Sequence, residues 1–131
     1  MREILFRGKR TDTKEWVEGM AFPHDNDKVT MFRQHSVDGI LVGDEVDPET
    51  VGQFTGLTDK NGKKIFEGDI IEDNIEYESN RYVINYLPYY ARFSAVKPNN
   101  VFCVFAYQRG EVIGNIYDNP ELLRDADNET D

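Results

Sequence analysis

The feature that most constrains the fold is a run of tight-turn signals within residues 53–73, QFTGLTDKNGKKIFEGDIIED. Asn61-Gly62 is the dipeptide that favours the two-residue turn of a β-hairpin, because both residues can adopt the positive φ angles which that turn needs. The flanking residues 53–57 and 63–66 are predicted to be the paired strands. The stretch therefore predicts antiparallel β structure.

A second tight turn follows at once in Glu67-Gly68-Asp69. Gly68 removes the Cβ clash that would otherwise oppose a sharp bend. The carboxylate of Asp69 is expected to accept backbone N–H bonds within the turn, which makes it a structural acid rather than a catalytic one. A new strand is predicted to start at Ile70.

Short β-prone segments with turn signals about every eight to twelve residues continue along the chain, a spacing typical of a β-sandwich or barrel. We predict further strands at residues 3–7, 16–22, 29–33, 40–42, 81–90, 101–107 and 112–117, and a polar loop at 72–80. Asp47-Pro48 and Asn119-Pro120 each place a capping side chain before a proline suited to a first helical turn. Short helical turns are therefore predicted near 47–51 and 119–124.

The predicted fold is mainly β, with an N-terminal β-meander over residues 1–52 packed on a small β-barrel of the SH3-like class over residues 53–124. Residues 125–131 are acidic with almost no apolar side chain, so they are expected to fray. The link at Val51-Gly52 is short, and we expect one compact unit overall.

The balance of charge bears on the class of partner. Twenty-five acidic residues against fifteen basic ones give a formal charge of −10, which disfavours broad nonspecific binding to phosphate backbones. The acidity serves solubility, or alternatively forms a surface that mimics DNA and occupies a basic protein. The sequence contains no run of about 18 apolar residues, so no membrane span is predicted. Residues 2–20 lack the apolar core of a signal peptide.

A catalytic site requires a nucleophile with a base, paired carboxylates or a metal cluster held within mutual reach. The single cysteine, Cys103, lies in an apolar run where burial disfavours the thiolate. His24 and His35 are isolated, and the tract at 24–27 lacks the glycine and distal glutamate of a calcium loop. The acids at 44–49 are predicted to be a solvated face. We predict no enzyme, no cofactor and no metal.

Residues 81–110 differ from the rest of the chain, because they contain no acid but hold half of its aromatic residues. Basic and aromatic side chains together can pair with phosphates and stack single-stranded bases, although the aromatics can equally fill a barrel core. Tyr89 and Tyr90 follow Pro88 and cannot both point inward, so at least one is expected at an oligomer interface or a ligand site. The candidate binding surface comprises Arg81, Tyr89, Tyr90, Arg92, Phe93, Lys97 and Arg109.

Four segments resemble the YopX-type proteins of bacteriophages and prophages. They are MREILFRGKRTDTKEWVEG at the start, VDPETVGQFTG, the central QFTGLTDKNGKKIFEGDII, and EVIGNIYDNPELL at 111–123. The resemblance implies a phage or prophage origin, the cytoplasm of a bacterial host and a mainly β fold. It implies no activity, because the family is functionally uncharacterised. Residues 74–110 carry no motif that is recognised from any family.

The sequence therefore predicts a non-enzymatic accessory protein that binds a host or phage protein and forms a homo-oligomer. The apolar run at 101–107, which has no polar face, favours an oligomer because one of its faces can meet another subunit. The alternatives are single-stranded nucleic-acid binding through residues 81–110 and the acidic DNA-mimic surface. No membrane partner is predicted.

Overall fold

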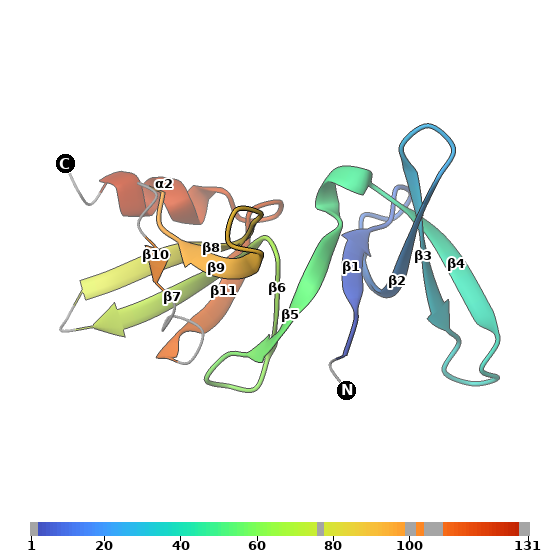
Figure 1. Cartoon of the computed structure of the whole chain (residues 1–131), viewed down its shortest axis with the longest axis horizontal. Coiled ribbons are helices and arrows are strands. Elements are labelled where there is room, and N and C mark those ends of the chain that lie inside the picture. Colours follow the sequence, from blue (N-terminus) through green and yellow to red (C-terminus); the bar gives the residue numbers. More distant parts are fainter. Residues whose placement is uncertain (1–2, 76–77, 99–101, 104–108, 129–131) are drawn as a thin grey trace. The chain divides into compact units, whose positions relative to one another are not determined.

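Figure 1 shows the computed structural model, which describes residues 3–75, 78–98, 102–103 and 109–128 of the chain. The fold is mainly β, as predicted. The strands are β1 (Phe6–Lys9), β2 (Trp16–His24), β3 (Lys28–Gln34), β4 (Leu41–Val46), β5 (Gly52–Thr58), β6 (Lys64–Phe66), β7 (Asp69–Ile75), β8 (Glu78–Leu87), β9 (Arg92–Val96), β10 (Phe102–Cys103) and β11 (Glu111–Asn115). The helical elements are η1 (Pro48–Thr50) and α2 (Glu121–Asn128).

The chain divides into two compact units after Phe54. In the first unit the antiparallel strands follow the order β4-β3-β2-β1-β5. Beyond Phe54, β5 continues into the second unit, where β6 is next to it in the strand order. The remaining strands of the second unit form an antiparallel sheet in the order β10-β9-β8-β7-β11.

In the core of the first unit, large buried side chains pack against glycines. Met31 is fully buried, and its side chain lies against the backbone of Gly8 and Gly19, where a Cβ would come within 3.4 Å of it. Val46 is almost fully buried as well, and it forms an isolated antiparallel bridge with Arg10. The sheet therefore curls so that the end of β4 meets the residues that follow β1.

Asp44 corrects the prediction of a solvated acidic face at 44–49. Its side chain is only 8% exposed, and its carboxylate pairs with the Nε of Arg33 at 3.1 Å and that of Arg10 at 3.8 Å. A buried carboxylate is tolerated when cations and hydrogen bonds compensate its lost hydration. Glu45 and Glu49 are exposed, as predicted.

The two proline-containing helix starts are where the sequence placed them. The Asp47 side chain accepts the backbone N–H of Glu49 at 3.1 Å and caps η1, with Pro48 at the first position. Asn119 and Pro120 precede α2, which extends to Asn128 and so passes the predicted end of the helix at 124.

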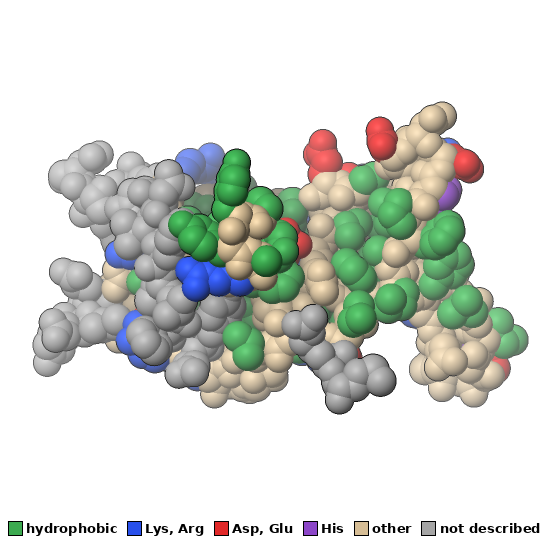
Figure 2. Space-filling model, viewed as in Figure 1, with side chains coloured by type: hydrophobic (Ala, Val, Ile, Leu, Met, Phe, Trp, Pro, Cys, Tyr) green, Lys and Arg blue, Asp and Glu red, His purple; other side chains and the backbone are tan. Residues whose placement is uncertain are grey.

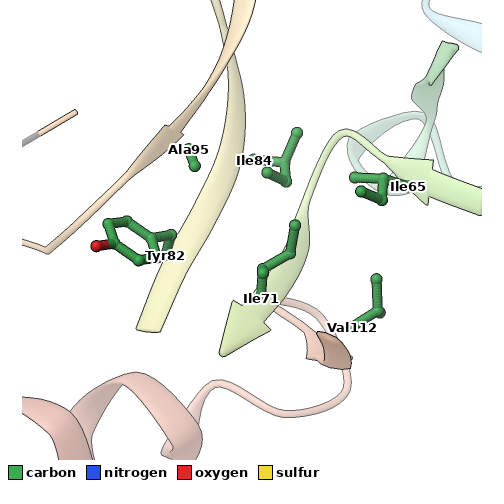
Figure 3. Close-up of a cluster of buried hydrophobic side chains, with 6 residues drawn as sticks. All are labelled: Ile65, Ile71, Tyr82, Ile84, Ala95 and Val112. Carbon is green, nitrogen blue, oxygen red and sulfur yellow. The ribbon is translucent and has the colours of Figure 1, made fainter. Parts of the chain in front are cut away.

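The core of the second unit is a cluster of buried side chains from β6, β7, β8, β9 and β11, drawn in Figure 3. It comprises Ile65, Ile71, Tyr82, Ile84, Ala95 and Val112. Among the described residues the sheet is open, with β10 and β11 at its edges, so they form no closed barrel and the predicted SH3-like class is not confirmed. Of the apolar run at 101–107, β10 covers two residues; the others, and all of the run's side chains, lie outside what the structure describes.

The predicted loop at 72–80 is wrong, because most of it belongs to β7 and β8, which pair with each other. The acidic side chains of β7 find cationic partners on β8 and in the segment just before β11. The Nε of Arg81 on β8 bonds to the Glu72 carboxylate at 3.0 Å, and the Nη2 of Arg109 bonds to the Asp73 carboxylate at 2.8 Å. Paired charges thus replace the apolar residues by which a strand is usually recognised in sequence.

The turn at Asn61-Gly62 is a turn, but of a different kind from the one predicted. Gly62 has a φ of 81°, whereas Asn61 does not adopt a positive φ. The N–H of Gly62 donates to the C=O of Asp59 at 3.0 Å, and the N–H of Asp59 donates to the C=O of Lys63 at 2.8 Å. These bonds define a three-residue loop with a type I turn followed by glycine in the left-handed region. Asp59 selects it, because aspartate favours the first position of a type I turn.

Gly62→Val is expected to lower the free energy of unfolding by about 1–3 kcal/mol, since a β-branched residue is strained at this φ. No atom lies within 4 Å of the position its Cβ would occupy, so the cost is one of backbone conformation alone. Lys63→Val is the control and should cost much less, because valine suits a residue paired across a hairpin. Denaturant melts compare the two variants. A Gly62→Val melt that matched the parent would contradict the turn assignment.

Candidate functional site

Two tyrosines of the predicted surface form the tip of the β8–β9 hairpin. Tyr89 is 98% exposed and Tyr90 is 62% exposed. The N–H of Tyr90 donates to the C=O of Leu87 at 3.1 Å, and the guanidinium of Arg92 lies 5.3 Å from the centre of the Tyr90 ring. The tip is therefore an ordered turn with exposed aromatic rings.

The other cations of that predicted surface are engaged within the second unit. Arg81 and Arg109 each pair with a carboxylate of β7. Arg81 also donates from Nη1 to the C=O of Leu122 at 2.7 Å, which ties β8 to α2. The Nζ of Lys97 bonds to Asn80 at 2.7 Å and lies 5.7 Å from the ring centre of Tyr82.

The seven residues consequently do not form one continuous surface. Arg81 and Tyr82 are neighbours in β8, so their side chains project from opposite faces of the sheet. Lys97 lies over the Tyr82 ring and is therefore on the face away from Arg81. Phe93 is half-buried and packs edge-to-face against Tyr86, at 5.3 Å between ring centres. The hairpin tip keeps its aromatic rings exposed, and Arg109 is exposed as well but pairs with Asp73.

A larger exposed surface, which was not predicted from the sequence, lies on the sheet of the first unit. Phe22, Met20 and Leu41 are 58%, 50% and 64% exposed. The register places Met20 opposite Phe32, and Phe32 opposite Gly43, so these positions share a face with Leu41 two residues along β4. We call this surface the apolar face, made of Trp16, Met20, Phe22, Phe32 and Leu41. Figure 2 shows hydrophobic side chains gathered over the strands of the first unit.

The apolar face is ordered by contacts among its own side chains and with two cations of β1. The rings of Phe22 and Phe32 pack edge-to-face with 6.3 Å between their centres. The guanidinium of Arg7 lies 4.7 Å from the centre of the Trp16 ring, and the Nζ of Lys9 lies 5.7 Å from it. Cations over an indole ring are attracted by its quadrupole. The end of the face around Trp16 thus carries two cations, and the exposed acid Glu18 lies opposite Arg7 on β2.

The alternation in WVEGMAF could have indicated this surface. Positions 16, 18, 20 and 22 hold three large apolar side chains and one glutamate, whereas 17, 19 and 21 hold valine, glycine and alanine, and the two sets lie on opposite faces of a strand. The pattern favours the large side chains as the core, but the structure buries the small-residue face under Met31 instead.

Asp59 is a buried acid with a structural role. Its Oδ1 accepts the N–H groups of Asn61 and Lys63, both at 2.9 Å, and its Oδ2 accepts the N–H of Val112 at 2.9 Å. Burial alone would raise the pKa of this carboxyl group. The three N–H bonds outweigh burial and hold the pKa below its ordinary value, with the bond from Val112 contributing most. Asp69 accepts the N–H of Phe66 at 2.8 Å within its turn.

Comparison with models of known protein families shows to which family the chain belongs. The model of the YopX protein family matches residues 5–124. The chain belongs to the YopX protein family. This confirms the resemblance carried by the turn-rich central stretch and by the segments at both ends.

A solved structure agrees with the family assignment. This chain is similar to the protein in the "Crystal structure of protein EF1440 from Enterococcus faecalis", with 29% sequence identity and a TM-score of 0.59. The likeness covers 94% of this chain and 99% of that one. A search of curated proteins finds no match.

Two further observations concern the parts of this YopX family chain that the structure describes. Within them, no three His, Cys, Asp or Glu side chains gather closely enough to hold a metal ion. The helices in the same ranges are too short or too polar to cross a lipid bilayer.

Proposed function

We propose that this YopX family protein is a non-enzymatic, homo-oligomeric module that works by binding another protein through its apolar face. The exposure of Met20, Phe22 and Leu41 carries the proposal, because each of them leaves half or more of its side chain in water. Contiguous exposed apolar side chains mark contact sites in soluble proteins. Burying them against a partner removes that area from water.

The composition of the face favours a protein partner. Aromatic residues, methionine and arginine are enriched at protein interfaces, and the apolar face offers Trp16 with Arg7, Met20 and two phenylalanines. A formal charge of −10 opposes a nucleic-acid partner. The family resemblance further supports a phage or prophage origin and a cytoplasmic setting in a bacterial host.

Site-specific photo-crosslinking in cells that express the protein tests the contact. A photoreactive phenylalanine analogue at Phe22 is expected to crosslink to one discrete protein, and Met20→Ser in the same chain should weaken that crosslink. The same analogue at Glu15, an exposed polar loop position in the same unit, is the matched control and should give none. A crosslink at position 22 to nucleic acid alone, or to nothing, would overturn the proposal.

The oligomer is tested separately. Light scattering at micromolar concentrations should give a mass that is a multiple of the 15.2 kDa of one chain. A monomer at every concentration would remove the homo-oligomer from the proposal and leave the partner contact to the crosslinking result.

The exposed hairpin tip favours a second candidate function, the binding of single-stranded nucleic acid. Tyr89 and Tyr90 could stack bases while Arg92 meets the backbone. This function predicts weak binding that fades with added salt and is weakened by Tyr90→Ala and by Arg92→Glu. Unchanged anisotropy of a labelled oligonucleotide at low salt would exclude it.

A further inference from the structure

The outer edge of β4 is only partly used by the fold. The N–H of Thr11 donates to the C=O of Glu45 at 3.1 Å, and the N–H of Asp47 donates to the C=O of Lys9 at 2.8 Å. On the inner side, the N–H of His35 donates to the C=O of Ile40 at 2.8 Å, next to the ladder with β3. Consecutive residues of β4 therefore direct their backbone groups alternately inward and outward.

This alternation fixes the direction of the remaining backbone groups. In an antiparallel ladder the N–H and C=O of one residue point to the same side, and those of the next residue to the other side. Glu45 points outward, so Gly43 and Leu41, two and four residues earlier, point outward as well. Among the described residues, none forms a hydrogen bond with these outward groups of Leu41 and Gly43.

The free part of the edge, residues 41–43, has no charge, proline or bulge that would oppose strand addition. Such edges are commonly protected by lysine, proline or a bulge. β4 reads LVGDEV, without lysine or proline, and its ladder with β3 runs without a register shift. Leu41 and the preceding Ile40 are each 64% exposed. The edge is a short, apolar template for another strand.

We propose that a second copy of the chain pairs with this edge, β4 against β4 in antiparallel direction, about a two-fold axis at Val42. Leu41 then lies opposite the partner subunit's Gly43, and Gly43 lies opposite the partner subunit's Leu41. The proposal rests on the self-association in the proposed function, and it specifies the surface and the register of that association.

The hydrogen bonds select this register. With Val42 on the axis, each outward pair exchanges both of its N–H···O bonds, so every free group of Leu41 and Gly43 is used. An axis at Leu41 would pair Gly43 with Gly39, whose N–H already donates to the C=O of His35 at 2.9 Å. An axis at Gly43 would pair Leu41 with Glu45, whose C=O already accepts from Thr11.

The side chains fit the same register. Leu41, a large residue, faces a glycine on both sides of the axis, and the ring of Phe32 lies 3.0 Å from the position of a Gly43 Cβ. Leu41 would therefore cover the edge of the partner subunit's apolar face. Asp44 lies opposite Ile40, and Glu45 lies opposite Gly39. No carboxylate faces another, as a pair of copies with a formal charge of −10 each requires.

Leu41→Lys in the full-length protein tests the pairing, because it places a cation beside the axis in each copy. It should raise the dissociation constant of the dimer at least about tenfold. Phe22→Ser changes the apolar face without touching the edge and should leave the dimer intact. Sedimentation velocity gives the constants, and amide exchange of the parent should show Leu41 and Gly43 protected only at concentrations where the dimer forms.

The outcomes separate the two proposals. A dimer that survives Leu41→Lys, or one in which the Gly43 amide exchanges freely, overturns the edge pairing and leaves self-association standing. A parent chain that stays monomeric at all concentrations overturns both the edge pairing and the homo-oligomer. Loss of the dimer in Leu41→Lys together with protected amides in the parent supports the register proposed.

Discussion

Asp59→Ala is expected to lower the free energy of unfolding by about 3 kcal/mol, because hydrogen bonds to a charged group are strong and a buried donor left without a partner is costly. The substitution removes the acceptor of three backbone N–H groups. The two in the hairpin loop can turn to water. The N–H of Val112 is buried, so it bears most of the loss. Urea unfolding measures the difference.

The neighbouring Glu111→Ala is the control. Glu111 is about half exposed, and its contact with Lys60 at 3.9 Å is a surface ion pair of small effect. Equal losses of stability in the two variants would contradict the role assigned to the Asp59 carboxylate.

The pH dependence gives an independent check on Asp59. Its pKa in the folded chain lies below the ordinary value of 3.8, so the unfolded chain binds the proton more readily. The stabilisation is fully present above pH 3.8 and is lost as the pH falls through the folded pKa. The difference in stability between the parent and Asp59→Asn should therefore be constant near neutral pH and shrink in acid. A difference that grew in acid would contradict the direction of the shift.

Gly19→Ala is expected to destabilise the first unit by about 3 kcal/mol or more, because overpacking against backbone cannot be relieved by a side-chain rotation. A Cβ at Gly19 would lie 2.2 Å from the backbone oxygen of Phe32 on β3 and 3.4 Å from the Cγ of Met31. Strands β2 and β3 would have to separate. Fluorescence of Trp16, the single tryptophan, follows this unit during denaturation.

The adjacent Glu18→Ala provides the comparison for Gly19→Ala. The Glu18 side chain is exposed, and adjacent residues of a strand project from opposite faces, so alanine at position 18 meets no backbone from β3. Matching midpoints for the two variants would show that the first unit tolerates a Cβ at position 19, against the close packing described.

Turns and caps were the part of the fold that the sequence predicted best. The start of η1 at Asp47-Pro48 and the hairpin around Gly62 depend on contacts between residues two to four positions apart. Such contacts are visible in a short stretch of sequence. The predicted type of the hairpin turn was wrong, because the prediction rested on Asn61-Gly62 alone and did not include the preference of Asp59 for the first position of a type I turn.

Contacts between distant residues decide what the sequence could not show. Residues 72–80 look like a loop because they are polar, but Glu72 and Asp73 are matched by cations at 81 and 109. The same pairs remove Arg81 and Arg109 from the candidate binding surface. Which face of β2 is buried depends on Met31 reaching over two glycines, and no pattern within β2 contains that information.

The reach of the Asp59 carboxylate bears on the order in which the second unit assembles. Its bonds to Asn61 and Lys63 span two and four residues, whereas its bond to Val112 spans 53. Closing a long loop costs more chain entropy than closing a short one, so contacts of small sequence separation form first. The hairpin can therefore take shape around the carboxylate while its second oxygen still faces water. β11 then docks onto an acceptor that is already in place, and this late step joins the two ends of the unit.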